Sequence, residues 1–191
     1  MSTKTSSITL QSQRVGIFKR GIAAMIDIYI SSVLANIPIL FIYSIETGET
    51  EMSRELSALS STSGILACIL GILLILLYYV VIPVYKFQGQ TLMKKLLGFK
   101  VMKTDSSNVD LKTMLKREAI GSMIVEGGLI SSGNYLRQLI LIITRANILH
   151  TGLLYISFGT TILSIIYMVF SKEHRTLHDY IAGTRVLDLK S

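Results

Sequence analysis

The feature that most constrains this chain is an uncharged apolar run from Gly64 to Tyr85. A helix needs about 20 apolar residues to cross the hydrocarbon core of a membrane, so this run predicts a spanning helix. Residues 20–43, whose apolar part is broken only by Asp27, and residues 151–170 predict two more. Of the 191 residues only 16% are charged, against about a quarter in a soluble domain. The chain is therefore predicted to be a multi-pass membrane protein.

The 19 lysines and arginines give a net charge of +7 and gather in the polar segments between the apolar runs. Cytoplasmic loops of membrane proteins carry an excess of these two residues. The N-terminal segment, residues 86–117 and the C-terminal tail hold most of them, whereas the charged residues within 44–63 are mainly acidic. We therefore predict a location in the cell membrane with both termini in the cytoplasm. Contact with anionic lipid head groups explains the basic residues better than nucleic acid does.

Two cytoplasmic termini require an even number of crossings. Residues 111–131 are the best remaining candidate, although this segment carries Glu118 and Glu126. Residues 134–149 are amphipathic and predict a helix in the membrane interface. Arg137 and Arg145 would then lie outside the cell, against the charge rule.

Two segments that begin at Thr91 and Thr176 are similar over their length, with a Thr-Leu start and a shared glycine, cation and valine. Each reads as a short amphipathic helix that a glycine ends in the left-handed conformation, followed by a strand. Pairing Phe99–Lys103 with Thr184–Asp188 would satisfy the backbone groups of both strands. The sequence therefore predicts a small two-stranded ribbon.

The segments ahead of these motifs also resemble each other. Lys19-Arg20 precedes a helix with Asp27, and Lys116-Arg117 precedes a segment with Glu126. The predicted fold is an all-α membrane protein: a bundle of four transmembrane helices built as two parallel-repeated hairpins, with short cytoplasmic amphipathic helices and the ribbon. Residues 1–191 would form this single membrane domain.

Asp27 is the first candidate functional residue. At helical spacing it shares a stripe with Arg20, Ser31 and small residues. An ionised carboxylate inside the membrane costs at least about 2.5 kcal/mol, so it must pair, become protonated or face water. An intramembrane acid is usually functional, but a structural ion pair that sets helix register is an equally serious interpretation.

Glu126 is the second candidate, if its segment spans the membrane. His174 and His178 have the spacing of a helical metal pair, but no third ligand accompanies them. The single cysteine, Cys68, lies in an apolar run, and no catalytic triad or phosphate loop is present. We therefore predict a protein that is not an enzyme, with no cofactor and no metal.

Three motifs together resemble the RDD family of bacterial and archaeal membrane proteins, which is named after an arginine and two aspartates. The opening motif contains Arg20 and Asp27, and Asp179 would be the second aspartate. The residues that match the central and closing motifs are Gly89, Gln90, Thr91, Gly98, Arg175, His178, Asp179 and Gly183. Met93 stands where the family usually has glycine. The resemblance implies the fold more strongly than an activity.

Two functions stay open at this point. One is proton-coupled transport of a cation or small solute, in which Asp27 and Glu126 exchange protons while Arg20 and Arg117 set their charge state. The other is a non-enzymatic partner of another membrane protein, in a regulatory or immunity-type role. A second copy of the chain is a further expected partner, because four helices make a thin-walled transporter.

Overall fold

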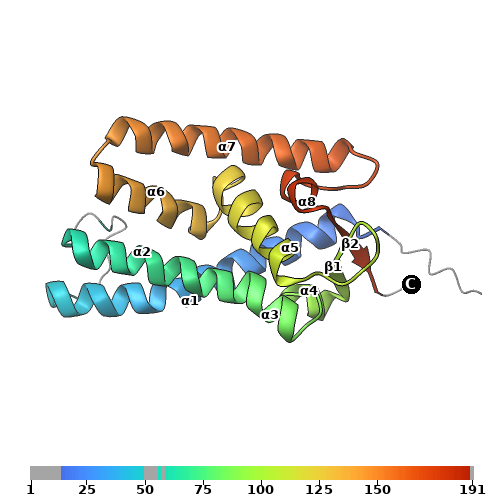
Figure 1. The fold of residues 1–191 in the computed structure, drawn as a ribbon, viewed down its shortest axis with the longest axis horizontal. Coiled ribbons are helices and arrows are strands. Elements are labelled where there is room, and N and C mark those ends of the chain that lie inside the picture. The colour runs from blue at the N-terminus through green and yellow to red at the C-terminus, as the bar shows by residue number, and fades with distance from the viewer. Residues whose placement is uncertain (1–13, 50–55, 57–58, 190–191) are drawn as a thin grey trace, which may run out of the picture.

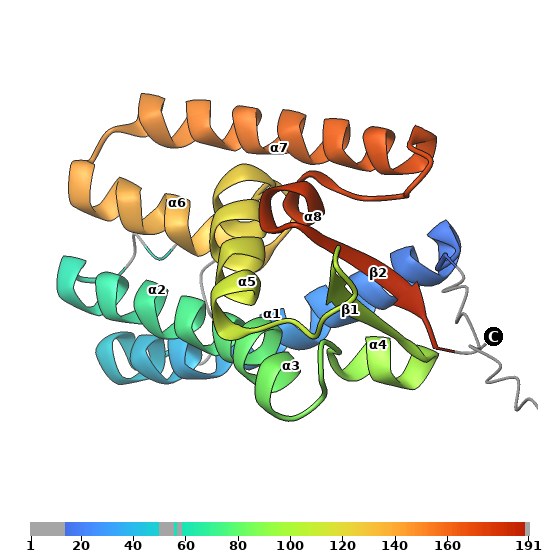
Figure 2. The same cartoon turned by 45° about the vertical axis from the view of Figure 1, so that its right-hand side comes forward.

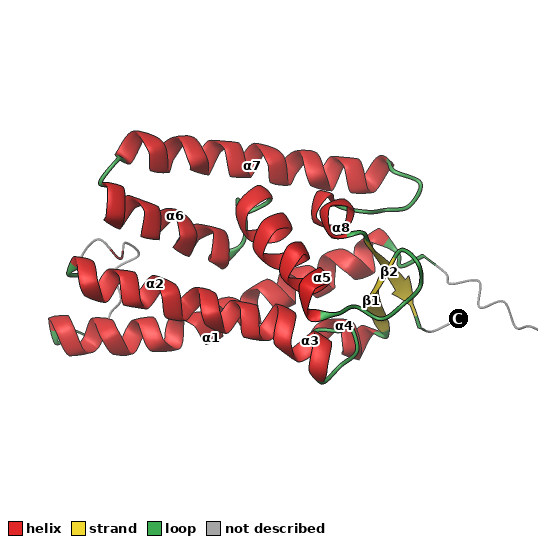
Figure 3. Ribbon diagram, in the orientation of Figure 1, coloured by secondary structure: helices red, strands yellow, loops and turns green. Residues whose placement is uncertain are grey.

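A computed structural model describes residues 14–49, 56 and 59–189 (Figure 1). Residues 50–55, 57 and 58, which belong to the segment that we predicted to lie outside the cell, fall outside the described residues. The elements, in chain order, are α1 (Ile17–Thr47), α2 (Ser61–Leu76), η2 (Leu77–Val81), α3 (Ile82–Tyr85), α4 (Leu92–Leu97), β1 (Phe99–Lys103), α5 (Leu111–Leu115), η3 (Lys116–Val125), α6 (Ser131–Thr144), α7 (Asn147–Phe170), α8 (Leu177–Ala182) and β2 (Thr184–Asp188). Helices dominate, and the two strands form one small sheet (Figure 3).

Among the described residues, three helices are long and apolar enough to cross a membrane: Ile17–Thr47, Ser61–Tyr85 and Asn147–Phe170. They coincide with the three spans predicted from apolar runs. The second is one continuous rod in which α2 passes through the π-helical stretch η2 into α3. Many large apolar side chains on these helices are exposed, as expected where lipid rather than protein covers a helix.

The remaining predicted span, 111–131, which is third along the chain, does not form one helix. Helical structure that begins at Leu111 ends at Val125, and residues 126–130 form a nonhelical break before α6. Glycines bring the backbone together here: a Cβ on Gly133 would lie 2.4 Å from the carbonyl oxygen of Gly127. The helix predicted over 134–149 has different bounds: α6 runs from Ser131 to Thr144, and α7 begins at Asn147. Its predicted place in the membrane interface stays a prediction.

Four helices lie side by side along the long axis of the molecule: α1, α2, α6 and α7 (Figure 1). The ribbon, α4 and α8 gather at one end, and η3 runs from that end toward the middle, where α6 continues to the opposite end (Figures 1 and 2). The break between η3 and α6 therefore lies at mid-length of the bundle.

The ribbon forms as predicted. β1 and β2 pair antiparallel over Phe99–Lys103 and Thr184–Asp188, with Val101 directly opposite Val186. The short helices that precede the strands begin at threonine N-caps, Thr91 and Thr176, and end at left-handed glycines. Because a threonine cap and a left-handed glycine satisfy orphan backbone groups locally, the sequence pattern alone was enough to locate these helices.

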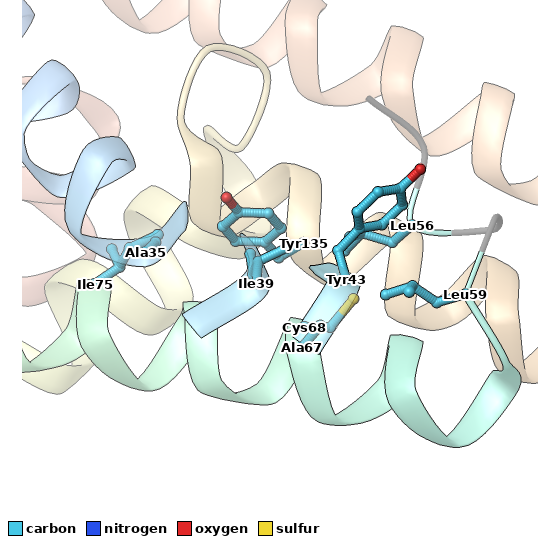
Figure 4. Close-up of a cluster of buried hydrophobic side chains, with 9 residues drawn as sticks. All are labelled: Ala35, Ile39, Tyr43, Leu56, Leu59, Ala67, Cys68, Ile75 and Tyr135. Atoms are coloured by element: carbon cyan, nitrogen blue, oxygen red, sulfur yellow. The ribbon is translucent and has the colours of Figure 1, made fainter. Parts of the chain in front are cut away.

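The core has two parts. In the bundle, small, aliphatic and aromatic side chains pack together, most of them from α1, α2 and α6 (Figure 4); the buried members are Ala35, Ile39, Tyr43, Leu56, Leu59, Ala67, Cys68, Ile75 and Tyr135. At the ribbon end, apolar residues of both strands join α1 and α5; they are Val15, Ala23, Val80, Phe99, Val101, Val109, Met114 and Val186. The second cluster ties the ribbon to the helices, so the polar side chains between them are held in place.

Candidate functional site

The carboxylate of Asp179 is the centre of a buried ionic cluster at the ribbon end of the bundle. The residue is 0% exposed. Arg20 donates from Nη2 to Oδ2 at 2.9 Å, and Arg117 donates from Nη2 to Oδ1 at 3.2 Å. Thr184 Oγ1 donates to Oδ1 at 3.1 Å. Asp179 also completes the capping box of α8 by accepting bonds from Thr176. One side chain thus joins α1, η3, α8 and β2.

Asp179 remains ionised although it is buried. Burial by itself would raise the pKa of this carboxyl, but the charges of Arg117 and Arg20 outweigh it and hold the pKa well below its usual value of 3.8. A buried anion that is flanked by two cations and several hydrogen-bond donors satisfies the pairing that a charge in low dielectric requires.

The cluster continues from Arg117 to the predicted site residue Glu126. Arg117 contacts Glu118 at 2.7 Å and the Nε2 atom of His178 at 2.8 Å. The Nδ1 atom of His178 lies 2.8 Å from a carboxylate oxygen of Glu126. Glu126 further accepts from the backbone N–H of His178 at 2.7 Å and from Ser164 at 2.8 Å. Glu126 is 8% exposed, so it is neither a solvated surface residue nor a lone acid.

Asp27 has a separate set of partners. It is 1% exposed and accepts hydrogen bonds from the hydroxyls of Tyr78 and Thr91 and, at 3.4 Å, from the backbone N–H of Met93. The ammonium of Lys94 lies 3.8 Å away. The expected influence of Arg20 on Asp27 has no direct contact behind it, because that guanidinium binds Asp179 and the carbonyl of His174. The cation beside Asp27 is therefore Lys94, whereas Arg20, on the same stripe of the helix, pairs with Asp179.

Asp27 and Glu126 contact the two short helices in the same way. Asp27 accepts from the N–H of Met93, two residues after Thr91, and Glu126 accepts from the N–H of His178, two residues after Thr176. A helix N-terminus favours a carboxylate, because its first N–H groups have no partner within the helix. Each acid therefore binds one short helix to the bundle.

The remaining motif residues shape the backbone around the cluster. Gly89 has φ +92, and a Cβ there would lie 2.2 Å from the carbonyl oxygen of Val101. Gln90 donates to the carbonyl of Phe99 at 2.9 Å, and Arg175 donates to the carbonyl of Thr184 at 2.9 Å. Ser31 donates to the carbonyl of Ile28 in its own helix. Residues named by the motifs thus surround the acids but do not all touch them.

A cavity of about 470 Å³ lies beside the break between η3 and α6. Residues of the break and of the first turns of α6 line it, together with parts of α1 and α7; the lining includes Asn36, Ile39, Gly128, Ser131, Asn134, Arg137, Gln138, Leu154 and Phe158. Arg137, which we expected outside the cell, is buried in the bundle with 5% exposure. Arg137, whose predicted position disagreed with the charge rule for cytoplasmic loops, therefore lies inside the helix bundle.

Sequence reasoning missed Tyr78, Ser164 and Arg137. Tyr78 lies in an uncharged run where nothing distinguishes a buried hydroxyl from an apolar ring. Ser164 did have a signal, because Ser157, Thr161 and Ser164 recur at helical spacing in the last span and are buried. Polar stripes of this kind mark helix faces that bind other helices.

These features define a small, mainly α-helical protein with three helices long and apolar enough to cross a membrane, capped at one end by a ribbon and a buried ionic cluster. The sequence model of the RDD family matches residues 14–183, and the chain belongs to that family. It is 28% identical over 166 residues to the uncharacterized protein YckC of Bacillus subtilis (strain 168), an alignment that covers 86% of this chain and 78% of the relative. No solved structure gives a significant match.

Proposed function

We propose that the chain is a multi-pass protein of the cell membrane that crosses four times, with both termini in the cytoplasm. The third crossing would be discontinuous, made by η3 from one end and α6 from the other. Support comes from Figure 1, where α6 lies along α2 and α7 and joins α7 at the end away from the ribbon. Irregular backbone at membrane depth is tolerated where protein or a cavity surrounds it.

The four crossings would form two hairpins related by a parallel repeat. Its support is the ribbon, in which Val101 lies opposite Val186, its equivalent in the similar segments. Leu189 donates to the carbonyl of Gly98 at 2.9 Å, and Thr104 donates to the carbonyl of Gly183 at 3.0 Å. These two bonds join equivalent pairs of residues, as expected if a local two-fold axis passes between the strands.

The function that this geometry supports best is transport of a small solute. The observation that carries it is the cavity at the break between η3 and α6, at mid-length of the bundle. Discontinuous helices that meet near the middle of the membrane are where many secondary transporters bind their substrates. The four-helix bundle would provide the walls, alone or with a second copy of the chain.

A small solute is favoured over a metal cation. Asp27 is closed off by Tyr78, Thr91, Met93 and Lys94, and it does not line the cavity. Arg137 carries the charge in the lining of that cavity, and its charge is positive. A cation would therefore meet repulsion where the cavity is, and the acid that should attract it is already occupied.

Proton coupling would use the Glu126–His178 pair instead. Because Arg117 donates to Nε2 of His178, we assign the proton of the neutral ring to Nδ1, which faces Glu126. A second proton on Nε2 would then point at the guanidinium of Arg117 and break that contact.

The test is flux in proteoliposomes with a pH-sensitive dye inside. We expect proton movement when an organic solute is added and none with Na⁺, K⁺ or Li⁺. Glu126→Gln should abolish the response, and Asp27→Asn should leave the flux per folded molecule within about twofold of wild type. Flux that follows Na⁺, K⁺ or Li⁺ and is lost in Asp27→Asn would reverse the assignment, and absence of flux with every solute would overturn transport.

A non-enzymatic partner role is the second candidate. The observation that favours it is the completeness of the bonding around Asp27 and Asp179, which fixes the ribbon and the short helices to the bundle. A rigid, basic face could then dock on anionic head groups and on another membrane protein. Purification from native membranes in mild detergent should yield a stoichiometric heteromer if this role is correct, and the chain alone or with its own copy if it is not.

A further inference from the structure

Arg137 is a buried cation without an acidic partner among the described residues. Its Nη1 donates to the carbonyl of Gly127 at 2.8 Å and to Ser157 Oγ at 3.1 Å, and its Nε is buried with no hydrogen-bond partner. The other deeply buried arginine, Arg117, has two carboxylate partners. A buried charge is normally paired, so an uncompensated guanidinium in a cavity wall points to a missing anion.

The start of α6 adds a second positive element at the same cavity. This helix has 14 residues, no side chain caps its N-terminus, and its first turn contains no acid. Ile130 and Ser131, at the start of the helix, both line the cavity. Free N–H groups and the helix dipole together favour negative charge at this end. Arg137 lies less than two turns further along the same helix, so the α6 N-terminus and the guanidinium both contribute positive charge to this cavity.

The rest of the lining is mixed. Asn36 and Asn134 contribute amide side chains to it, and Ile39, Leu154 and Phe158 provide apolar surface. A volume of about 470 Å³ lies within the range of small-molecule sites. An inorganic ion would leave most of this space and its apolar walls unused.

We propose that this cavity binds an organic anion, with its carboxylate or phosphoryl group on Arg137 and the α6 N-terminus and its apolar part against Ile39, Leu154 and Phe158. A guanidinium offers parallel donors that match either anionic group. This proposal deepens the proposed transport function by naming the class of solute. The same chemistry serves a free anion or the head group of an anionic lipid.

Binding to the full-length protein in neutral detergent can be measured by calorimetry, without any flux. The probes are hexanoate, hexyl phosphate, dihexanoyl phosphatidate and, as an uncharged control, 1-hexanol. We expect at least one anionic probe to bind and hexanol to bind at least tenfold more weakly. Preference for hexanoate or hexyl phosphate indicates a free anion, and preference for phosphatidate indicates a lipid head group.

Two substitutions place the ligand. Arg137→Gln should weaken binding at least tenfold, whereas the matched control Arg145→Gln, at the exposed end of the same helix, should change it less than twofold. Asn134→Asp should also abolish binding, because it adds a carboxylate that repels the anion and pairs with Arg137. Since an acid in the first turn stabilises a helix, this variant should fold even if Arg137→Gln does not.

Three results would overturn the proposal: no anionic probe binds, hexanol binds as tightly as hexanoate, or binding appears only after Glu51→Gln or Glu55→Gln. The last would mean that the chain's own carboxylate occupies the cavity. These two glutamates belong to the segment 50–55, outside the described residues. Failure of transport is a different outcome, because a protein that binds hexanoate through Arg137 but moves no solute keeps the site and loses the transport function.

Discussion

Arg20 binds the carboxylate of Asp179, 159 residues further along the chain, at 2.9 Å, while Asp27, seven residues after Arg20 in the same helix, binds other partners. The arginine and the two aspartates that give the family its name therefore do not form one ion triad. Arg20 joins the first helix to α8, and Asp27 joins the same helix to Tyr78 and to the start of α4. Two clamps hold the ribbon end to the bundle.

Asp179→Asn should destabilise the fold strongly. The substitution removes the anion between Arg20 and Arg117, and breaking a buried pair in this way costs about 3–5 kcal/mol. The exposed pair of Arg175 and Glu173 provides the control, because Glu173→Gln should cost less than about 1 kcal/mol. Thermal unfolding in detergent measures both. Equal melting temperatures for wild type and Asp179→Asn would contradict the clamp.

The stabilisation by Asp179 should persist in mild acid. Its folded-state pKa lies well below the ordinary value of 3.8, so its contribution is fully present above that value and is lost only as the pH falls through the lower folded-state pKa. The difference in melting temperature between wild type and Asp179→Asn should therefore stay constant from about pH 8 to pH 5 and shrink only below about pH 4. A difference that disappears near pH 6 would show that another group provides the stabilisation.

Gly89→Ala should damage the turn ahead of α4. The residue has φ +92, and the added Cβ would meet the carbonyl oxygen of Val101, which cannot move without disturbing the ribbon. We expect a loss of about 2 kcal/mol or more from strain and overlap. Gly159→Ala is the matched control: nothing lies within 4 Å of its Cβ, and alanine in a helix gains up to about 1 kcal/mol. Similar effects of the two substitutions on the melting temperature would refute this account.

The discontinuous third crossing predicts which side of the membrane each turn faces. Single cysteines at Thr104, in the turn after β1, and at Asn147, at the start of α7, can be placed in a Cys68→Ala background. A membrane-impermeant maleimide added to intact cells should label Asn147→Cys but should label Thr104→Cys only after permeabilisation. If the chain crosses three times only, Asn147→Cys will require permeabilisation too.

Local patterns in the sequence located the elements that local chemistry specifies. Thr91 and Gly98 mark the beginning and end of α4, and the strands of the ribbon have the predicted ends. In each case the residue that satisfies the backbone lies within a few positions of the group that it satisfies. Neighbouring residues therefore carry the information.

The span at 111–131 was harder to predict, because its composition argued against a membrane helix while the charge distribution argued for one. Glu126, two glycines and the Ser-Ser-Gly sequence of 131–133 weakened the predicted span, yet charge parity demanded a crossing. The break depends on Gly127 meeting Gly133 and on Gly128 packing against Phe158, contacts that involve another turn and another helix. No local pattern encodes which helix a glycine will approach.

The sequence by itself determined the membrane class, the three apolar helices, the ribbon and the candidate acids, because apolar length, backbone caps and strand pairing are properties of short segments. The tertiary structure decided the partners: Arg20 with Asp179, Glu126 with His178, and Arg137 at the cavity without an acid among the described residues. Partners were beyond prediction because a buried charge takes the opposite charge or donor that packing brings within about 3 Å, from any distance along the chain.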